Sequence, residues 1–134
     1  MSRTDPLATR RAEWIAALRA GRLDEYVSLI TQDAVWAPPG TSALHSRTAI
    51  RAWLEPFVAQ YEYDMRIERP SVRLAGDWAV ERGAFLSRLR PRAGGDWHSH
   101  RGTYVILWRR LTDGQWYIDR YLDTTELAEP SAPD

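Results

Sequence analysis

The sequence predicts an α+β fold, because segments with helical patterning come first along the chain and long strand-like segments follow. The first half holds apolar residues at three-four spacing, and the second half alternates and is punctuated by turns. Helices that precede an antiparallel sheet must pack onto one of its faces. If the sheet curls, the space between the layers holds a pocket. This order indicates where a site could lie and leaves its chemistry open.

Length and charge narrow the class of protein. The chain has 134 residues, with 18 basic and 18 acidic residues and no cysteine. We expect residues 1–127 to form one domain and residues 128–134 to be a flexible tail. The balanced charge gives no indication of a nucleic-acid partner. The missing cysteine excludes disulfides, thiolate nucleophiles and cysteine-based metal sites.

The sequence shows no apolar segment of the kind that targets or anchors a protein. Its first six residues lack the apolar core of a signal peptide. No apolar run approaches the roughly 18 residues that a membrane-spanning helix needs. We therefore expect a cytoplasmic protein without a membrane partner.

The aromatic residues are unusual in kind: seven Trp and six Tyr stand against two Phe. Indole and phenol rings bury much area and keep a polar group, which suits a pocket for a ring-containing ligand or a subunit interface. We expect Trp14, Trp36 and Trp53 to line the pocket wall. Packing in a small core is an equal alternative for each of them.

Two helices are predicted before the first strand. The first spans about residues 6–20, with Asp5 as its N-cap and Gly21 at its exit. The second spans about residues 23–31. Apolar residues and one long aliphatic stem at helical spacing mark their inward faces: Leu7, Arg11, Trp14, Ile15 and Leu18, then Tyr26, Leu29 and Ile30.

A short strand at residues 34–37 follows and ends at a Pro-Pro-Gly turn. Residues 41–45 read as a loop that leads to a third helix beginning near Arg47. Pro56 should kink this helix or end its regular part. Its apolar face comprises Ile50, Trp53, Leu54, Phe57 and Tyr61.

Four strands are predicted in the second half, at about residues 64–74, 78–89, 97–110 and 116–123. Turns rich in Gly and Asp separate them. The third of these strands carries apolar residues at both odd and even positions, so both of its faces should be partly covered.

Together these segments resemble the SnoaL-like and ketosteroid-isomerase-like branch of the nuclear transport factor 2 superfamily. The resemblance covers about residues 6–126. The segments that carry it are residues 14–24, 33–40, 47–50, 76–79, 101–104, 109–110 and 113–116. It implies a cone-shaped α+β barrel, in which a curved antiparallel sheet wraps on the N-terminal helices and a pocket opens at the wide end. It also implies a homodimer.

The resemblance leaves the activity open, because this fold hosts isomerases, cyclases, dehydratases, epoxide hydrolases and non-catalytic binders. The catalytic carboxylate of the steroid isomerases corresponds to Ala37, and their oxyanion-binding tyrosine falls near Trp14. Their oxyanion-binding aspartic acid falls near Val105 or Ile106. With all three groups replaced, the resemblance does not imply that mechanism. Similarity to the SnoaL-like cyclases places Asp123 on their acid/base aspartate.

Asp119, Tyr121 and Asp123 alternate along the last strand, so an unbulged strand would aim all three at one face. If that face lines the pocket, a carboxylate could take a proton from a carbon next to a carbonyl group. A Tyr or Trp donor could then stabilise the enolate. If the face is outward, these are solvated polar residues, and the neighbouring Trp116 and Ile118 favour that alternative unless a bulge switches the alternation.

His98 and His100 also alternate, at the start of a strand. They could be rim histidines, they could bind a metal ion if a third ligand were near, or His100 could act as an acid or base near neutral pH. We expect no metal. By alternation they share a face with Tyr104 and Trp108, which we expect, with His98, to contact the substrate.

Four other polar residues are predicted to have structural or surface roles. Glu81 and Arg82 are adjacent in a strand and point to opposite faces, so a cross-strand surface ion pair suits each. Asp33 should brace a helix-to-strand turn. His45 should be a surface loop residue or lie at the lip of the pocket.

The leading functional hypothesis is a cofactor-free SnoaL-like enzyme that performs acid/base chemistry on a hydrophobic ring-bearing molecule, such as a polyketide or steroid-like compound. Its candidate catalytic residues are Asp123, Tyr121, His100 and Asp119. The alternatives are a non-catalytic small-molecule-binding domain and a dimerising accessory domain of the same fold.

Overall fold

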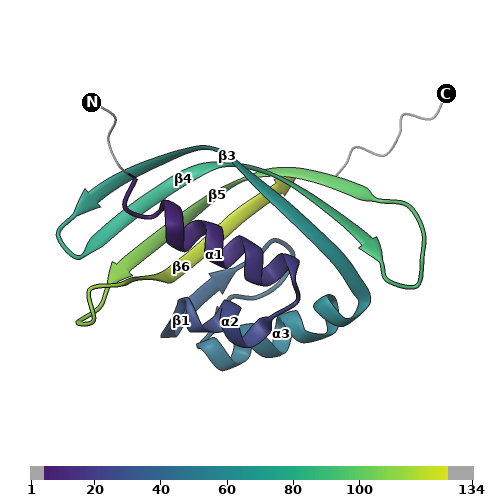
Figure 1. Cartoon of the computed structure of the whole chain (residues 1–134), viewed down its shortest axis with the longest axis horizontal. Coiled ribbons are helices and arrows are strands. Elements are labelled where there is room, and N and C mark those ends of the chain that lie inside the picture. The colour runs from purple at the N-terminus through teal and green to yellow at the C-terminus, as the bar shows by residue number, and fades with distance from the viewer. Residues whose placement is uncertain (1–4, 127–134) are drawn as a thin grey trace.

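The computed structural model describes residues 5–126 and has an α+β architecture in which a curved sheet arcs over three helices (Figure 1). Its elements, in chain order, are α1 (Ala8–Arg19), α2 (Leu23–Ser28), β1 (Ile30–Ala37), β2 (Leu44–His45), α3 (Arg47–Gln60), β3 (Tyr61–Ala75), β4 (Trp78–Pro91), β5 (His98–Arg110) and β6 (Trp116–Glu126). The predicted fold class is confirmed. The predicted tail at residues 128–134 lies outside the described residues.

The six strands form one open sheet in the order β2-β1-β6-β5-β4-β3. All neighbouring pairs are antiparallel except β1 and β6, which run parallel. The chain reaches β6 only after the β3-β4-β5 meander, so β1 joins the sheet beside the last strand. The helices lie on the concave side, where the sheet and helices enclose the core (Figure 1).

Helix α1 begins at Ala8, two residues later than predicted, and Asp5 is not its N-cap. The carboxylate of Asp5 accepts a hydrogen bond from the backbone N–H of Leu7 at 2.9 Å, although the N-cap position itself is Leu7. The helix buries Trp14, Ala17 and Leu18 against the sheet. Gly21 follows at φ +72°, a conformation that glycine adopts without strain.

Three predicted boundaries are wrong. Helix α2 ends at Ser28 and β1 begins at Ile30, so Asp33 lies exposed inside a strand and does not brace a turn. Helix α3 continues through Pro56 to Gln60, and Tyr61 starts β3. Strand pairing explains the early start of β1, because Ile30 already pairs with β6. His45 is exposed in the short strand β2, which was predicted as loop.

A β-bulge interrupts the pairing of β5 with β6. Leu107 pairs with Arg120, whereas Trp108 pairs with Ile118, so Asp119 is left over. An extra residue reverses the alternation of a strand beyond it. Ile118 and Tyr121 therefore both face the helices, although they are an odd number of residues apart.

The convex face of the sheet keeps apolar side chains in contact with solvent. Val80, Val105 and Leu122 are 46%, 37% and 46% exposed. Val105 on β5 pairs with Leu122 on β6. Val80 on β4 pairs with Leu107, which is two residues from Val105 on the same face of β5. Both faces of β5 are thus partly covered, as predicted, although the convex face keeps more exposed apolar surface than the concave face. Within residues 5–126, no helix is long and apolar enough to cross a membrane.

Candidate functional site

A cavity of about 580 Å³ opens between the helices and the concave face of the sheet. The helical side contributes mainly apolar and aromatic side chains, and the sheet contributes most of the polar ones. Its lining residues from the helices and from β1 with its following turn are Trp14, Leu18, Tyr26, Trp36, Pro38, Pro39, Trp53, Leu54, Pro56 and Phe57. Those from β3 to β6 are Tyr63, Met65, Phe85, Ser87, Leu89, His100, Tyr121 and Asp123.

Tyr121 and Asp123 form a pair on the wall of this cavity. The Tyr121 hydroxyl donates a hydrogen bond to Oδ2 of Asp123 at 2.7 Å. Both side chains are half-buried. Burial, followed by the nearby Asp123 carboxylate, holds the pKa of Tyr121 well above its ordinary value. Tyr121 therefore stays a phenol near neutral pH and acts as a donor rather than as a base.

A cluster of four aromatic rings forms one end of the cavity. The ring centroids of Trp14 and Tyr121 lie 5.7 Å apart, and those of Trp36 and Tyr121 lie 5.2 Å apart. Tyr26 completes the cluster at 5.9 Å from Trp14 and 6.4 Å from Trp36. These contacts hold the ring that carries the Tyr121 hydroxyl in a fixed orientation beside Asp123.

Burial also keeps two other tyrosines of the cavity protonated. It raises the pKa of Tyr63 to about 12, with the Asp123 charge adding to the effect. It raises the pKa of Tyr26 far above the ordinary value, although the indole N–H groups of Trp14 and Trp36 lie near enough to offset this in part. The cavity therefore presents phenol groups rather than phenolates.

One polar atom of the lining is left without a partner. Trp14 is 2% exposed, and among the described residues its Nε1 has no partner in hydrogen-bond geometry. The indole packs against the Tyr26 ring, and its N–H contributes to lowering the pKa of that phenol without meeting the geometry of a hydrogen bond. A buried donor of this kind carries a desolvation cost.

The structure brings together six of the ten residues predicted for the site. Asp123, Tyr121 and His100 line the cavity on the sheet side, and the bulge at Asp119 provides the reversal of alternation that this arrangement needs. The other three are the predicted wall residues, Trp14, Trp36 and Trp53. Trp53 is 42% exposed and thus lies at the rim.

Asp119 does not join Tyr121 and Asp123, because it is the bulged residue. Its carboxylate is buried and accepts a hydrogen bond from the Thr31 hydroxyl at 2.9 Å. Arg109 and Arg120 lie 3.7 and 3.4 Å from its oxygens. These contacts give Asp119 a role in joining β6 to β1 rather than a place in the cavity.

His98 is exposed and does not line the cavity, although it precedes His100 by two residues on the same strand. His98 pairs with Leu89 and His100 pairs with Ser87. His98 therefore lies two residues nearer the end of the strand, further from the core. Among residues 5–126, no three side chains of the types His, Asp and Glu gather where they could hold a metal ion.

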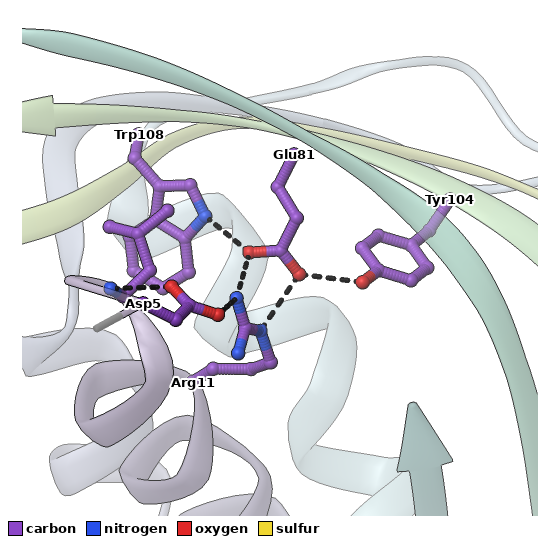
Figure 2. A network of polar contacts seen from close by, with 6 residues as sticks. Asp5, Arg11, Glu81, Tyr104 and Trp108 are labelled. Atoms are coloured by element: carbon purple, nitrogen blue, oxygen red, sulfur yellow. Dashed lines mark hydrogen bonds and ion pairs between the residues drawn. The ribbon is translucent and has the colours of Figure 1, made fainter. Parts of the chain in front are cut away.

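Tyr104 and Trp108 face the helices as predicted, but they contact Glu81 rather than the cavity. The Tyr104 hydroxyl donates to Oε2 of Glu81 at 2.6 Å, and Nε1 of Trp108 donates to Oε1 at 3.1 Å (Figure 2). Both rings are buried under α1. They are therefore part of a structural network.

Glu81 itself corrects a prediction, because it is fully buried and not part of a surface ion pair. Arg11 from α1 reaches it with two hydrogen bonds of 2.8 Å, one to each carboxylate oxygen. Asp5 holds the same guanidinium at 2.9 Å (Figure 2). Arg82 is exposed. The clue in the sequence is that Glu81 shares its alternation with Ala79, Phe85 and Ser87, which face the helices.

Residues from β3 and β4 complete the cavity and were not predicted to line it. Tyr63 and Met65 come from β3, and Phe85, Ser87 and Leu89 come from β4. Their alternating positions are visible in the sequence. Which face is concave cannot be read from the sequence of either strand, because that depends on where the helices pack.

The family model of the SnoaL-like domain matches residues 12–118. The chain belongs to this family. The match spans both helical and strand segments that enclose the cavity, and the SnoaL-like assignment made from the sequence is confirmed. A search of curated proteins found no match.

Solved structures share the fold of this SnoaL-like domain. A ketosteroid isomerase-like protein from Erwinia carotovora aligns with a TM-score of 0.77 at 18% identity, covering 92% of this chain and 95% of the other. ActVI-ORFA from Streptomyces coelicolor aligns with 0.78 at 16%, covering 90% and 95%. A nuclear transport factor 2-like superfamily protein from Salmonella enterica aligns with 0.80 at 10%, covering 96% and 94%. At these identities the likeness shows the fold alone.

Proposed function

We propose that this SnoaL-like domain is an enzyme that performs acid/base chemistry on a hydrophobic ring-bearing molecule with its own side chains. The observation that carries the proposal is the Tyr121–Asp123 hydrogen bond on the wall of an aromatic cavity that His100 also lines. A carboxylate and an imidazole in one cavity are the two kinds of group that proton removal and return require.

In this proposal Asp123 is the base. It takes the proton from a carbon next to a carbonyl group, and the electron pair of the C–H bond moves onto the carbonyl oxygen as an enolate. Tyr121 is a positioning residue, because its hydroxyl fixes one carboxylate oxygen. His100 lies on the same wall and, in its protonated form, gives a proton to a carbon of the enolate as the carbonyl re-forms; Asp123 and His100 then return to their starting states by proton exchange with water.

The shape and lining of the cavity favour a ring-bearing substrate. A volume of about 580 Å³ is within the range of small-molecule sites. Indole and phenol side chains suit contact with a flat ligand. Polyketide-like and steroid-like compounds have this character, and fold neighbours named ketosteroid isomerase-like protein and ActVI-ORFA support an isomerase, cyclase or dehydratase type of reaction.

Deuterium exchange into 2-tetralone, a bicyclic ketone, tests the proton-transfer step. The protein is incubated with the ketone in D₂O, and loss of the C–H signals next to the carbonyl is followed by proton NMR. The domain should accelerate exchange above the buffer rate, and Asp123→Asn should slow the catalysed part roughly 100-fold or more.

The matched control is Asp33→Asn, which makes the same change on an exposed residue of β1. It should leave the exchange rate unaltered. If the unmodified protein exchanges the ketone no faster than Asp123→Asn does, the acid/base proposal is wrong for this class of carbonyl compound.

A non-catalytic ligand-binding domain is the second candidate, and one observation favours it. The position of the isomerases' catalytic carboxylate is Ala37, which does not line the cavity. Saturable binding of 2-tetralone without any exchange above the buffer rate would support this candidate. A domain whose role is dimerisation alone would not require such a cavity.

We also propose that the domain is a homodimer formed through the convex face of the sheet. The exposed side chains of Val80, Val105 and Leu122 form neighbouring rows there and would be covered by a second copy. Val105→Glu should convert a dimer to a monomer in sedimentation-velocity experiments. A monomeric unmodified protein at micromolar concentration would contradict the proposal.

A further inference from the structure

Two glycines on the concave face of the sheet are each covered by an aromatic ring from the neighbouring strand. Phe85 on β4 pairs with Gly102 on β5, and Gly83 on β4 pairs with Tyr104 on β5. Neither glycine has a positive φ, so glycine is needed here for space and not for backbone conformation. A glycine inside a strand often marks a close approach of this kind.

Both rings lie directly on the backbone of these glycines. A Cβ atom on Gly102 would lie 2.7 Å from Cζ and 2.8 Å from Cε1 of Phe85, and it would also collide with the backbone oxygen of Thr124. A Cβ atom on Gly83 would lie 2.8 Å from the Tyr104 hydroxyl oxygen. The Phe85 ring can therefore lie this low on the sheet only because residue 102 has no side chain, and from that position it lines the cavity.

The strand register places the Phe85 ring between the two groups proposed to transfer protons. His100, Gly102 and Tyr104 follow one another on the concave face of β5. Asp123 on β6 pairs with Tyr104, so Gly102 lies in the row of paired residues between that of Asp123 and that of His100. Cζ is the ring atom of Phe85 furthest from its own backbone, and it lies over Gly102. The ring therefore reaches from β4 into this middle row.

A substrate that reaches both groups must lie across the middle row. Asp123 and His100 line the cavity, and so does Phe85, which is 5% exposed. Phe85 is thus the floor of the cavity between them, and helices α1 and α3 contribute to the opposite wall. The height of the floor limits the thickness of a ligand at this point. A planar ring fits, whereas a group that projects from the plane of the ring collides with Phe85.

We infer that Phe85, held down on Gly102, is a specificity-determining residue that selects planar ring substrates over those with groups projecting from the ring plane. This role rests on the proposed function for the place of the reacting carbons, and it narrows the substrate class to ketones that are flat beside the carbonyl group. Phe85 contacts the substrate and takes no part in the proton transfer.

Two ketones that differ in thickness test this role: 2-tetralone and 1,1-dimethyl-2-tetralone. The methyl groups of the second project from opposite faces of the ring, and the hydrogens on its C3 atom remain exchangeable. Dissociation constants are measured by calorimetry. The unmodified protein should bind the dimethyl ketone about tenfold or more weakly than 2-tetralone. Phe85→Ala, which removes the ring from the floor, should bring the two constants to within about twofold of each other.

Two further variants separate this role from a general loss of packing. Phe85→Leu removes fewer atoms and should narrow the difference to about three- to fivefold, which keeps the comparison available if Phe85→Ala does not fold. Phe57→Ala is the matched control, because Phe57 also lines the cavity but projects from α3 and packs against Tyr61 and Tyr63. It should leave the ratio of the two constants within about twofold of that of the unmodified protein. Tighter binding of the thicker ketone cannot result from a loss of folding.

The role of Phe85 is overturned if the unmodified protein binds both ketones equally, if both Phe85 variants keep its preference for 2-tetralone, or if Phe57→Ala removes that preference as Phe85→Ala does. Binding and deuterium exchange are read separately. If the preference depends on Phe85 but neither ketone exchanges its hydrogens above the buffer rate, the acid/base proposal fails and selection by Phe85 stands. If exchange depends on Asp123 and the preference does not depend on Phe85, the reverse is true.

Discussion

Two groups of polar side chains on the concave face of the sheet are built from similar residue types and differ in whether a cavity reaches them. Glu81 is contacted by Tyr104 and Trp108, and Asp123 lies beside Tyr121 and, one ring further, Trp14. Around Glu81, an arginine fills the remaining space. Around Asp123, the space is a cavity.

The difference lies in access to solvent and to the cavity. Glu81 has no exposed surface and accepts four hydrogen bonds, two from Arg11, one from Tyr104 and one from Trp108 (Figure 2). Asp123 is half-buried and lines the cavity. A carboxylate that is closed to solvent cannot receive a substrate, whereas one on a cavity wall can be reached, so similar residues give a structural network in one place and a candidate site in the other.

The largest effect on stability should come from Glu81→Gln. The change removes the negative charge that compensates buried Arg11, leaving Asp5 as its partner. Breaking a buried pair costs about 3–5 kcal/mol, and the remaining Asp5 contact suggests the lower end, about 3 kcal/mol. Urea unfolding would measure it.

Glu13→Gln is the matched control for this prediction, since Glu13 is 50% exposed and reaches Arg10 only at 3.9 Å. It should change the free energy of unfolding by less than about 0.5 kcal/mol. Equal effects of the two substitutions would show that the Glu81 network contributes no more than a surface pair.

A smaller loss in the free energy of unfolding should appear at alkaline pH, and tyrosines of both regions should contribute to it. The folded-state pKa values of Tyr121, in the cavity, and Tyr104, beside Glu81, are raised first by burial and then by their carboxylate partners. A raised pKa contributes stability that is complete below the unfolded value of about 10 and is lost as pH rises through the folded value. Each such tyrosine should lower the free energy of unfolding by about 1.4 kcal/mol per pH unit in that window.

Phe variants separate the two regions in this experiment. Tyr121→Phe and Tyr104→Phe should each reduce the alkaline slope by about one proton, measured by urea unfolding between pH 9 and 12. At pH 7, Tyr104→Phe should cost more, because it leaves Glu81 one donor short in a site closed to solvent. An unaltered slope in both variants would mean that neither phenol is held protonated by the fold.

The smallest change in the free energy of unfolding should come from Asp123→Asn. The amide oxygen of Asn can still accept from Tyr121, and the cavity gives the new amide group access to solvent. We expect the free energy of unfolding to change by less than about 1 kcal/mol at pH 7 in urea unfolding. A loss as large as that of Glu81→Gln would mean that Asp123 is a structural carboxylate like Glu81.

Much of the fold can be predicted from the sequence because its signals are local. Apolar residues at helical spacing give α1 and α3, and alternation with Gly-Asp turns gives the β3-β4-β5 meander. The start of β1 at Ile30 could not be predicted, because its partner is β6, 88 residues further along the chain. Glu81 was assigned to the surface because its partner, Arg11, is 70 residues away.

The sequence by itself determined that helices pack on one face of a sheet rich in Trp and Tyr, and that the last strand carries Tyr121 and Asp123 two residues apart. Only the tertiary structure decided that Glu81 lies in the closed network and that Asp123 lies on the wall of the cavity. The bulge at Asp119 turns Tyr121 and Asp123 toward the helices, and the position of α1 brings Arg11 to Glu81 and Trp14 to the cavity. Both depend on contacts between distant segments, which local patterns of polarity do not encode.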